Sequence, residues 1–153
     1  MEVIDGRLDG ELVCIRIDPG ELFLETLKQV IEEKRIKAGV VISGIGSMSV
    51  CRIHVVNAGY PPNLLTRKQD YYEYKGSIEV LALQGIIANG EPHLHITVAD
   101  ENQNAHGGHV ENGCVVLTMA EVVILRADTL PARRELRFRE KLTQLTYFEG
   151  VTP

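Results

Sequence analysis

The sequence lacks an apolar run long enough to cross a membrane as a helix. Such a helix needs about 18 or more consecutive apolar residues, and no stretch of the 153-residue chain approaches that length. The first residues, MEVIDGRLDGE, are acidic and mixed, without the basic start and apolar stretch of a secretion signal. We therefore expect a soluble, cytoplasmic protein with no membrane partner, folded as one domain over residues 1–153.

Cysteine is scarce, and its spacing does not form a metal or redox motif. Cys14, Cys51 and Cys114 are odd in number, widely separated and free of any CxxC pair. This usage is typical of reduced cytoplasmic proteins. We expect each cysteine to be a small apolar core residue rather than a nucleophile.

Positive charge is in deficit. The chain has 16 Lys and Arg against 21 Asp and Glu, a formal net charge of −5. An acidic surface repels phosphate backbones, so nucleic acid would need a local basic patch. The densest candidate is PARRELRFRE, which contains Arg133, Arg134, Arg137 and Arg139. Glutamates interrupt it and no aromatic ladder accompanies it, so we interpret it as a solvated strand face.

Strand patterns dominate what the sequence does contain. Segments typical of strands lie at 11–17, 38–48, 49–56, 70–75, 77–88, 92–99 and 114–127, with a short return strand at GGHV and an alternating ELRFRE near the end. One helix follows the first strand, with Asp18 as its expected N-cap and an apolar stripe of Leu24, Leu27 and Ile31. The order predicts an α+β domain with a largely antiparallel sheet and one main amphipathic helix.

A glycine-rich stretch, SGIGSM, interrupts the strand pattern at residues 43–48. It lacks the GxGxxG spacing, and no helix follows to bind a phosphate. We therefore expect a tight bend or bulge between two strands. His54, on the second of these strands, is predicted to be a structural histidine.

Histidine is concentrated in EPHLHITVADENQNAHGGHV, residues 91–110. Residues i and i+2 of a strand face the same side, so His93 and His95 project together. The polar run after them centres near Asn102, and a symmetrical hairpin there places residue 109 opposite residue 95. His109 then joins the other two imidazoles.

Three imidazoles from two adjacent strands are a ligand set for Zn²⁺ or another divalent transition metal, with a fourth position left for water or a ligand. Gly107 and Gly108 would permit close backbone approach. Glu111 could share the face of His109 as a supporting acceptor, a fourth ligand or a general base. His106, through its HxxH spacing, is an alternative third ligand. The non-metal interpretation is a hydrogen-bonded histidine cluster.

The ordered combination of ISGIGSM, GEPHLHITVADENQNAHGGHV and GCVVLTMAEVVIL resembles the plants-and-prokaryotes conserved (PPC) domain family, over roughly residues 5–148. The resemblance implies a homotrimer with a fold like that of acetolactate decarboxylase, in which histidines hold zinc. Its metal ligands correspond to His93, His95 and His109.

The resemblance also implies roles outside the histidines. Its glycine bend corresponds to Gly44 and Gly46, its strand glycine to Gly85, and its acidic strand residue to Glu121. An uncompensated carboxylate within TMAEVVIL would be costly, so Glu121 is expected to be paired, hydrogen-bonded or close to the site.

Three functions of different classes follow. The first is a metal-binding homotrimeric module that serves assembly or sensing and catalyses no reaction. The second is a metal-dependent lyase or hydrolase acting on a small keto or hydroxy acid, with Glu111 or Glu121 moving the proton and Arg52 anchoring a carboxylate. The third is a DNA-binding or transcription-associated protein. In plants, the domain of this family is joined to AT-hook segments that enter the minor groove, and family members are often labelled DNA-binding for that reason. This sequence contains no RGRP-type hook, so we expect no nucleic-acid partner.

Overall fold

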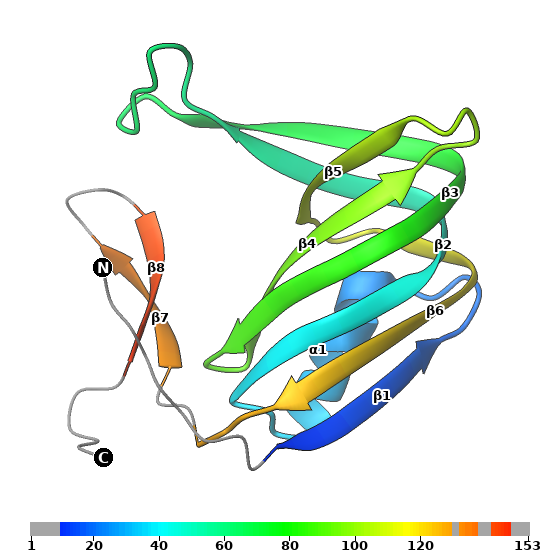
Figure 1. The fold of residues 1–153 in the computed structure, drawn as a ribbon, viewed down its shortest axis with the longest axis vertical. Coiled ribbons are helices and arrows are strands. Elements are labelled where there is room, and N and C mark those ends of the chain that lie inside the picture. The colour runs from blue at the N-terminus through cyan, green and yellow to red at the C-terminus, as the bar shows by residue number, and fades with distance from the viewer. Residues whose placement is uncertain (1–9, 130–131, 138–141, 148–153) are drawn as a thin grey trace.

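Among the residues that the structure describes, the body of the protein is a six-stranded antiparallel sheet with one helix. The computed structural model describes residues 10–129, 132–137 and 142–147. The elements are β1 (Glu11–Ile17), α1 (Phe23–Glu33), β2 (Ala38–Asn57), β3 (Lys68–Ala88), β4 (Glu91–Ala99), β5 (Ala105–Val110), β6 (Val115–Arg126), β7 (Ala132–Arg137) and β8 (Leu142–Tyr147). The α+β class with a largely antiparallel sheet is confirmed (Figure 1). Within the described residues, no helix is both long and apolar enough to cross a membrane.

The sheet curls so far that part of it closes on itself. Its strand order is β1-β6-β2-β3-β4-β5, and β5 pairs in addition with β2. This last pairing consists of Ile53 with Val110 and His54 with His109. Strands β2, β3, β4 and β5 therefore form a closed ring of pairings, which brings the histidine-rich hairpin next to β2.

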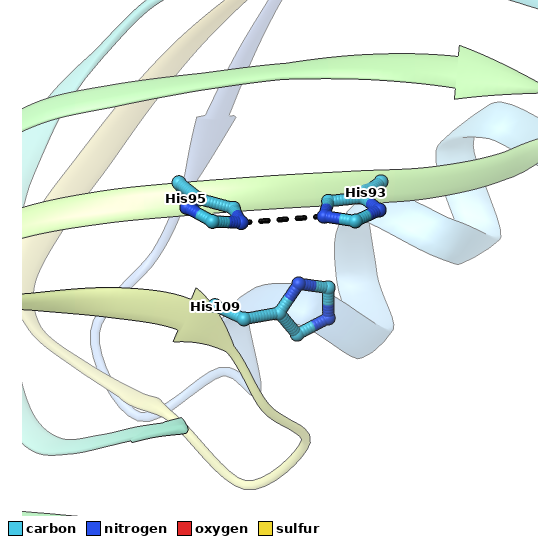
Figure 2. Close-up of side chains that lie close together, drawn as sticks. All are labelled: His93, His95 and His109. Carbon is cyan, nitrogen blue, oxygen red and sulfur yellow. Dashed lines mark hydrogen bonds between the residues drawn. The ribbon is translucent and has the colours of Figure 1, made fainter. Parts of the chain in front are cut away.

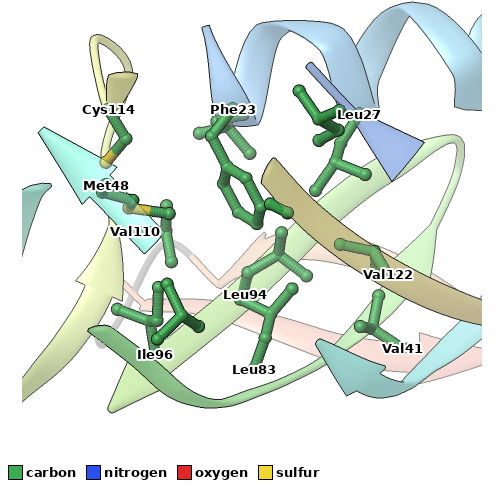
Figure 3. Close-up of a cluster of buried hydrophobic side chains, with 14 of the residues drawn as sticks. Phe23, Leu27, Val41, Met48, Leu83, Leu94, Ile96, Val110, Cys114 and Val122 are labelled. Carbon is green, nitrogen blue, oxygen red and sulfur yellow. The ribbon is translucent and has the colours of Figure 1, made fainter. Parts of the chain in front are cut away.

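The helix covers the concave face of the sheet. Its apolar stripe is buried, as expected, and Phe23 and Leu27 are each only 1% exposed. They pack over Leu83 and Leu94 of the sheet (Figure 3). Burying a side chain of this size stabilises the fold by about 1.5–3 kcal/mol. This core fixes which face of β4 points inward.

The helix begins later than the sequence predicts. Asp18 is not the N-cap, because α1 starts at Phe23 and its N-cap position is Leu22, without a side-chain cap. Residues 18–22 form a turn and a strand contact instead of a helical turn. The Glu21 backbone N–H donates to the Asp18 carbonyl, and Leu22 forms an isolated β-bridge with Val115. Tertiary pairing with the start of β6 therefore outweighs the local capping preference.

The strands on either side of residues 58–67 are much longer than the sequence predicts. The segments 38–48 and 49–56 form one strand, β2, and 70–75 and 77–88 form one strand, β3. The expected glycine feature is present as bulges rather than a turn, with register shifts between Val41 and Ser43 and between Gly46 and Met48. Beyond the body of the sheet, the end of β2 and the start of β3 extend, with the connection 58–67 between them, as a two-stranded arm (Figure 1).

The cysteines divide into two kinds. Cys51 and Cys114 are fully buried, as expected, whereas Cys14 is exposed on β1, so its assignment to the core is wrong. Cys14 alternates with the core residue Val13 and therefore faces outward. A hydrogen bond with Cys114, together with burial, raises the pKa of Cys51 far above its usual range. Its thiol therefore stays protonated and is a poor nucleophile.

The arginine-rich segment forms part of a second, two-stranded sheet in which β7 pairs with β8. The side chains of Arg133, Arg134 and Arg137, and all of Arg139, lie outside the described residues. The prediction of a solvated strand face therefore stays a prediction.

Candidate metal centre

The hairpin register places His95 directly opposite His109. Strands β4 and β5 pair from His95–His109 to Ala99–Ala105, around a turn that contains Asn102. The predicted symmetrical hairpin is confirmed. Asp100 holds the turn by accepting hydrogen bonds from the backbone N–H groups of Asn102 and Asn104, each at 2.9 Å.

The core decides which way the histidines point. Leu94 and Ile96 are each 2% exposed and face α1, so His93 and His95 point to the opposite face of β4. Their Nε2 atoms lie 3.2 Å apart. The His109 ring stands edge-on to both, at centroid distances of 4.6 Å from His93 and 5.6 Å from His95 (Figure 2).

This arrangement fits a transition-metal ion. For a metal–nitrogen distance of about 2.0–2.1 Å, two tetrahedral ligands are separated by about 3.3 Å. The Nε2–Nε2 distance of 3.2 Å between His93 and His95 matches that edge. The three ligand atoms of His93, His95 and His109 all lie within 4.8 Å of one another. The three histidines predicted from the sequence thus form a possible metal-binding group.

A second group adjoins the first and shares His109. It consists of His54, His109 and Glu111, whose ligand atoms also lie within 4.8 Å of one another. His54 is 8% exposed, its Nδ1 lies 2.5 Å from Glu111 Oε1, and its ring is 4.6 Å from that of His109. His54 is therefore a buried, hydrogen-bonded histidine, as predicted, but one that lies beside the candidate metal centre.

Glycine makes this proximity possible, as the sequence predicts. A Cβ on Gly108 would lie 2.6 Å from the backbone oxygen of His54, much closer than such atoms pack. Any larger residue at 108 would hold β5 away from β2. The pairing of His54 with His109 depends on this contact.

His106, the alternative third ligand, does not join the group. It lies three positions before His109, so the two side chains lie on opposite faces of β5. Its Nε2 lies 3.0 Å from Asp100 Oδ2, and its ring stacks on Tyr74 at 4.2 Å. His106 therefore supports the hairpin instead.

An open groove of about 880 Å³ runs beside the three histidines. Its lining residues are His54, Val55, Val56, Arg67, Gln69, His93, His95, Ile96, Thr97, Gly107, Gly108 and His109. Arg67 and Gln69 come from the arm and were not found from the sequence. They lie in a stretch with the pattern of a polar loop, and no local signal indicates that it lines the same groove as β4 and β5.

Of the three predicted catalytic residues, only Glu111 lies near the histidines. Arg52 is bound by Glu73, with an Nη2–Oε2 distance of 2.6 Å, and is not among the lining residues of the groove. Glu121 is exposed on β6, paired in register with Arg16 and Ile45. The expectation that Glu121 is paired, hydrogen-bonded or close to the site assumed a buried carboxylate, and this assumption is wrong, because Glu121 faces outward between the buried Ala120 and Val122. Glu121 belongs to neither histidine group and does not line the groove.

Similar proteins of known structure share the fold. A metal-containing protein from Archaeoglobus fulgidus superimposes with a TM-score of 0.78 at 21% identity, over 97% of this chain and 100% of that one. The α-acetolactate decarboxylase of Bacillus subtilis gives 0.52 at 20% identity, over 79% of this chain and 53% of the decarboxylase. At these identities the likeness concerns the fold alone.

Similarity in sequence extends to a larger protein. The bifunctional protein GlmU of Synechococcus sp. (strain JA-3-3Ab) is 31% identical over 119 residues, which are 78% of this chain. The chain spans only 17% of the length of that relative. Residues 5–128 match the model of the Plants and Prokaryotes Conserved (PCC) domain. The chain therefore belongs to the Plants and Prokaryotes Conserved domain family.

Proposed function

We propose that the protein is a metal-binding module that holds one divalent transition metal, zinc foremost, through His93, His95 and His109. The observation that carries the proposal is the 3.2 Å separation of two Nε2 atoms, with a third imidazole edge-on from the next strand. A set of three neutral nitrogens favours Zn²⁺ and its neighbours over Mg²⁺ or Ca²⁺, which prefer oxygen. The groove leaves a side of the group open to a further ligand.

Metal content tests this proposal. We expect the purified protein to contain about one metal per chain by elemental analysis, and His95→Ala and His109→Ala to lose most of it, because two imidazoles bind weakly. The matched control is His106→Gln, which changes the same strand on its other face and should keep the metal. Unchanged metal in both alanine variants would falsify the assignment.

We also propose that the module assembles as a homotrimer, as the family resemblance implies. The convex face of the sheet carries seven apolar side chains with exposures of 37–53%: Val40, Ile42, Ile45, Leu81, Ile86, Leu117 and Met119. Ile86 pairs with Val40 on one side and with His93 on the other. An apolar surface of this kind is typical of an interface between copies of a chain.

A metal-dependent lyase or hydrolase acting on a small keto or hydroxy acid is the second candidate. The observation that favours it is the contact of Glu111 with His54, because a carboxylate that orients an imidazole beside a metal group is an arrangement used for proton transfer. A bound metal would supply Lewis acidity. An enzyme would be established if the zinc-loaded protein turns over such acids. The Glu111→Gln variant should then lose this activity while its metal content stays unchanged.

A further inference from the structure

The groove beside the histidines has a wall built from hydrogen-bond donors of the arm. Arg67 directly precedes β3, and Gln69 is its second residue, paired in register with Val56. The Arg67 Nη1 donates to the Leu64 carbonyl at 2.8 Å, which holds the guanidinium in place. Both side chains reach the same groove as His93 and His95.

The Gln69 side chain has its amide oxygen engaged within the arm, which leaves its amide N–H groups as the donors for a ligand. The Tyr71 hydroxyl donates to Gln69 Oε1 at 2.7 Å, so the amide oxygen is already used as an acceptor. A primary amide has two N–H donors besides that oxygen. The Tyr71 ring itself lies against His54, at a centroid distance of 5.5 Å, which ties this orientation to the histidines.

The described lining of the groove carries no carboxylate. Among the described residues that line it, none is Asp or Glu, and Arg67 is the permanently charged one. This contrasts with the net charge of −5 over the whole chain. A surface that is acidic overall and has a cationic, donor-rich groove favours a small anion over an extended polyanion, which the surrounding surface would repel.

We propose that the groove binds a small oxyanion, of carboxylate or phosphate type, between the metal position and Arg67. A metal held by His93, His95 and His109 would attract one oxygen of the anion, while the planar Arg67 guanidinium pairs with the remaining oxygens and the Gln69 amide adds a further donor. The volume of about 880 Å³ is in the range of small-molecule sites. This inference rests on the proposed metal site and names the class of ligand that the site takes.

Calorimetric titration of zinc-loaded protein with oxalate, and separately with inorganic phosphate, tests the inference at constant ionic strength. We expect at least one of the two to bind, and Arg67→Gln to weaken that binding by about tenfold or more. Lys68→Gln is the matched control: it removes the same charge from the neighbouring, 69% exposed side chain, and should leave the affinity unchanged. Binding of oxalate alone or phosphate alone supports the proposal and identifies the source of the oxyanion.

Two further measurements keep the outcomes distinct. In cobalt-substituted protein, the bound anion should change the visible absorption spectrum, because it enters the metal's coordination. Arg67→Lys should bind with intermediate affinity and provides the comparison if Arg67→Gln does not fold. A wild-type protein that fails to bind metal would contradict the metal site itself. Full metal content with neither anion bound, or with equal affinity in Arg67→Gln, overturns this inference and leaves the metal site standing.

Discussion

At the scale of single residues, Gly85 shows how the position of a histidine depends on the strand behind it. A Cβ at this position would lie 2.2 Å from the backbone oxygen of His93 and 2.6 Å from Cδ2 of Leu94. Strand β3 can pair closely with β4 here only because residue 85 has no side chain. The backbone of a candidate metal ligand therefore has no room to shift toward β3.

We predict that Gly85→Ala destabilises the protein by about 1–3 kcal/mol, the usual cost of overpacking, and lowers its metal content. The added methyl group must push β4 outward and carry His93 away from His109. Urea unfolding and elemental analysis of the same preparation measure both effects. A variant as stable as the wild type, with full metal, would contradict this account of the residue.

The candidate site is partly predictable at this scale. The convergence of His93, His95 and His109 follows from strand alternation and a symmetrical turn, both of which are local. The placement of His54, Arg67 and Gln69 depends on β2 meeting β5 and on the arm lining the groove. These pairings join residues far apart in the sequence, and periodicity carries no information about them.

At the scale of elements, the β4–β5 hairpin depends on the ionised form of one turn residue. Asp100 accepts hydrogen bonds from the backbone of Asn102 and Asn104 and contacts His106. The hydrogen bond with His106, followed by those from Asn104, lowers the pKa of Asp100 from 3.8 to about 2. A carboxyl group whose pKa is lower in the folded state stabilises that state when it is ionised.

We predict that the stability supplied by Asp100 is fully present above about pH 4 and is lost as the pH falls toward 2. Asp100→Asn should therefore be less stable than the wild type at pH 6, and the difference should shrink below pH 4. Urea midpoints of the two proteins between pH 6 and pH 2.5 measure it. A difference that stays constant over this range would show that ionisation of Asp100 is not its cause.

The elements themselves were predicted in kind but not in extent. Alternation and apolar runs identify β1, β4 and β6 because each is a simple half-buried or buried strand. The length of β2 and β3 was missed because bulges shift the pattern, as between Met48 and Val50, and a shifted pattern resembles two strands. The helix start was missed because Leu22 pairs with Val115, which a capping signal at Asp18 does not reveal.

At the scale of the whole molecule, the exposed apolar face of the sheet predicts assembly. We expect sedimentation of the wild type to give the mass of a trimer, and Ile42→Glu to shift it toward the monomer, since burying the new carboxylate is costly. Leu22→Glu, at an exposed position just before α1, is the control and should leave the mass unchanged. A monomeric wild type would contradict the proposal.

The ring of four strands closes through only two residue pairs, Ile53 with Val110 and His54 with His109. One member of the second pair, His109, is also a candidate ligand. An ion held by His109 and by the two histidines of β4 would fasten β5 at the seam where it meets β2. Metal binding and the pairing of β5 with β2 are then thermodynamically linked. Removal of the metal by a chelator should destabilise the β2–β5 pairing first and the pairing of β1, at the far edge of the sheet, last.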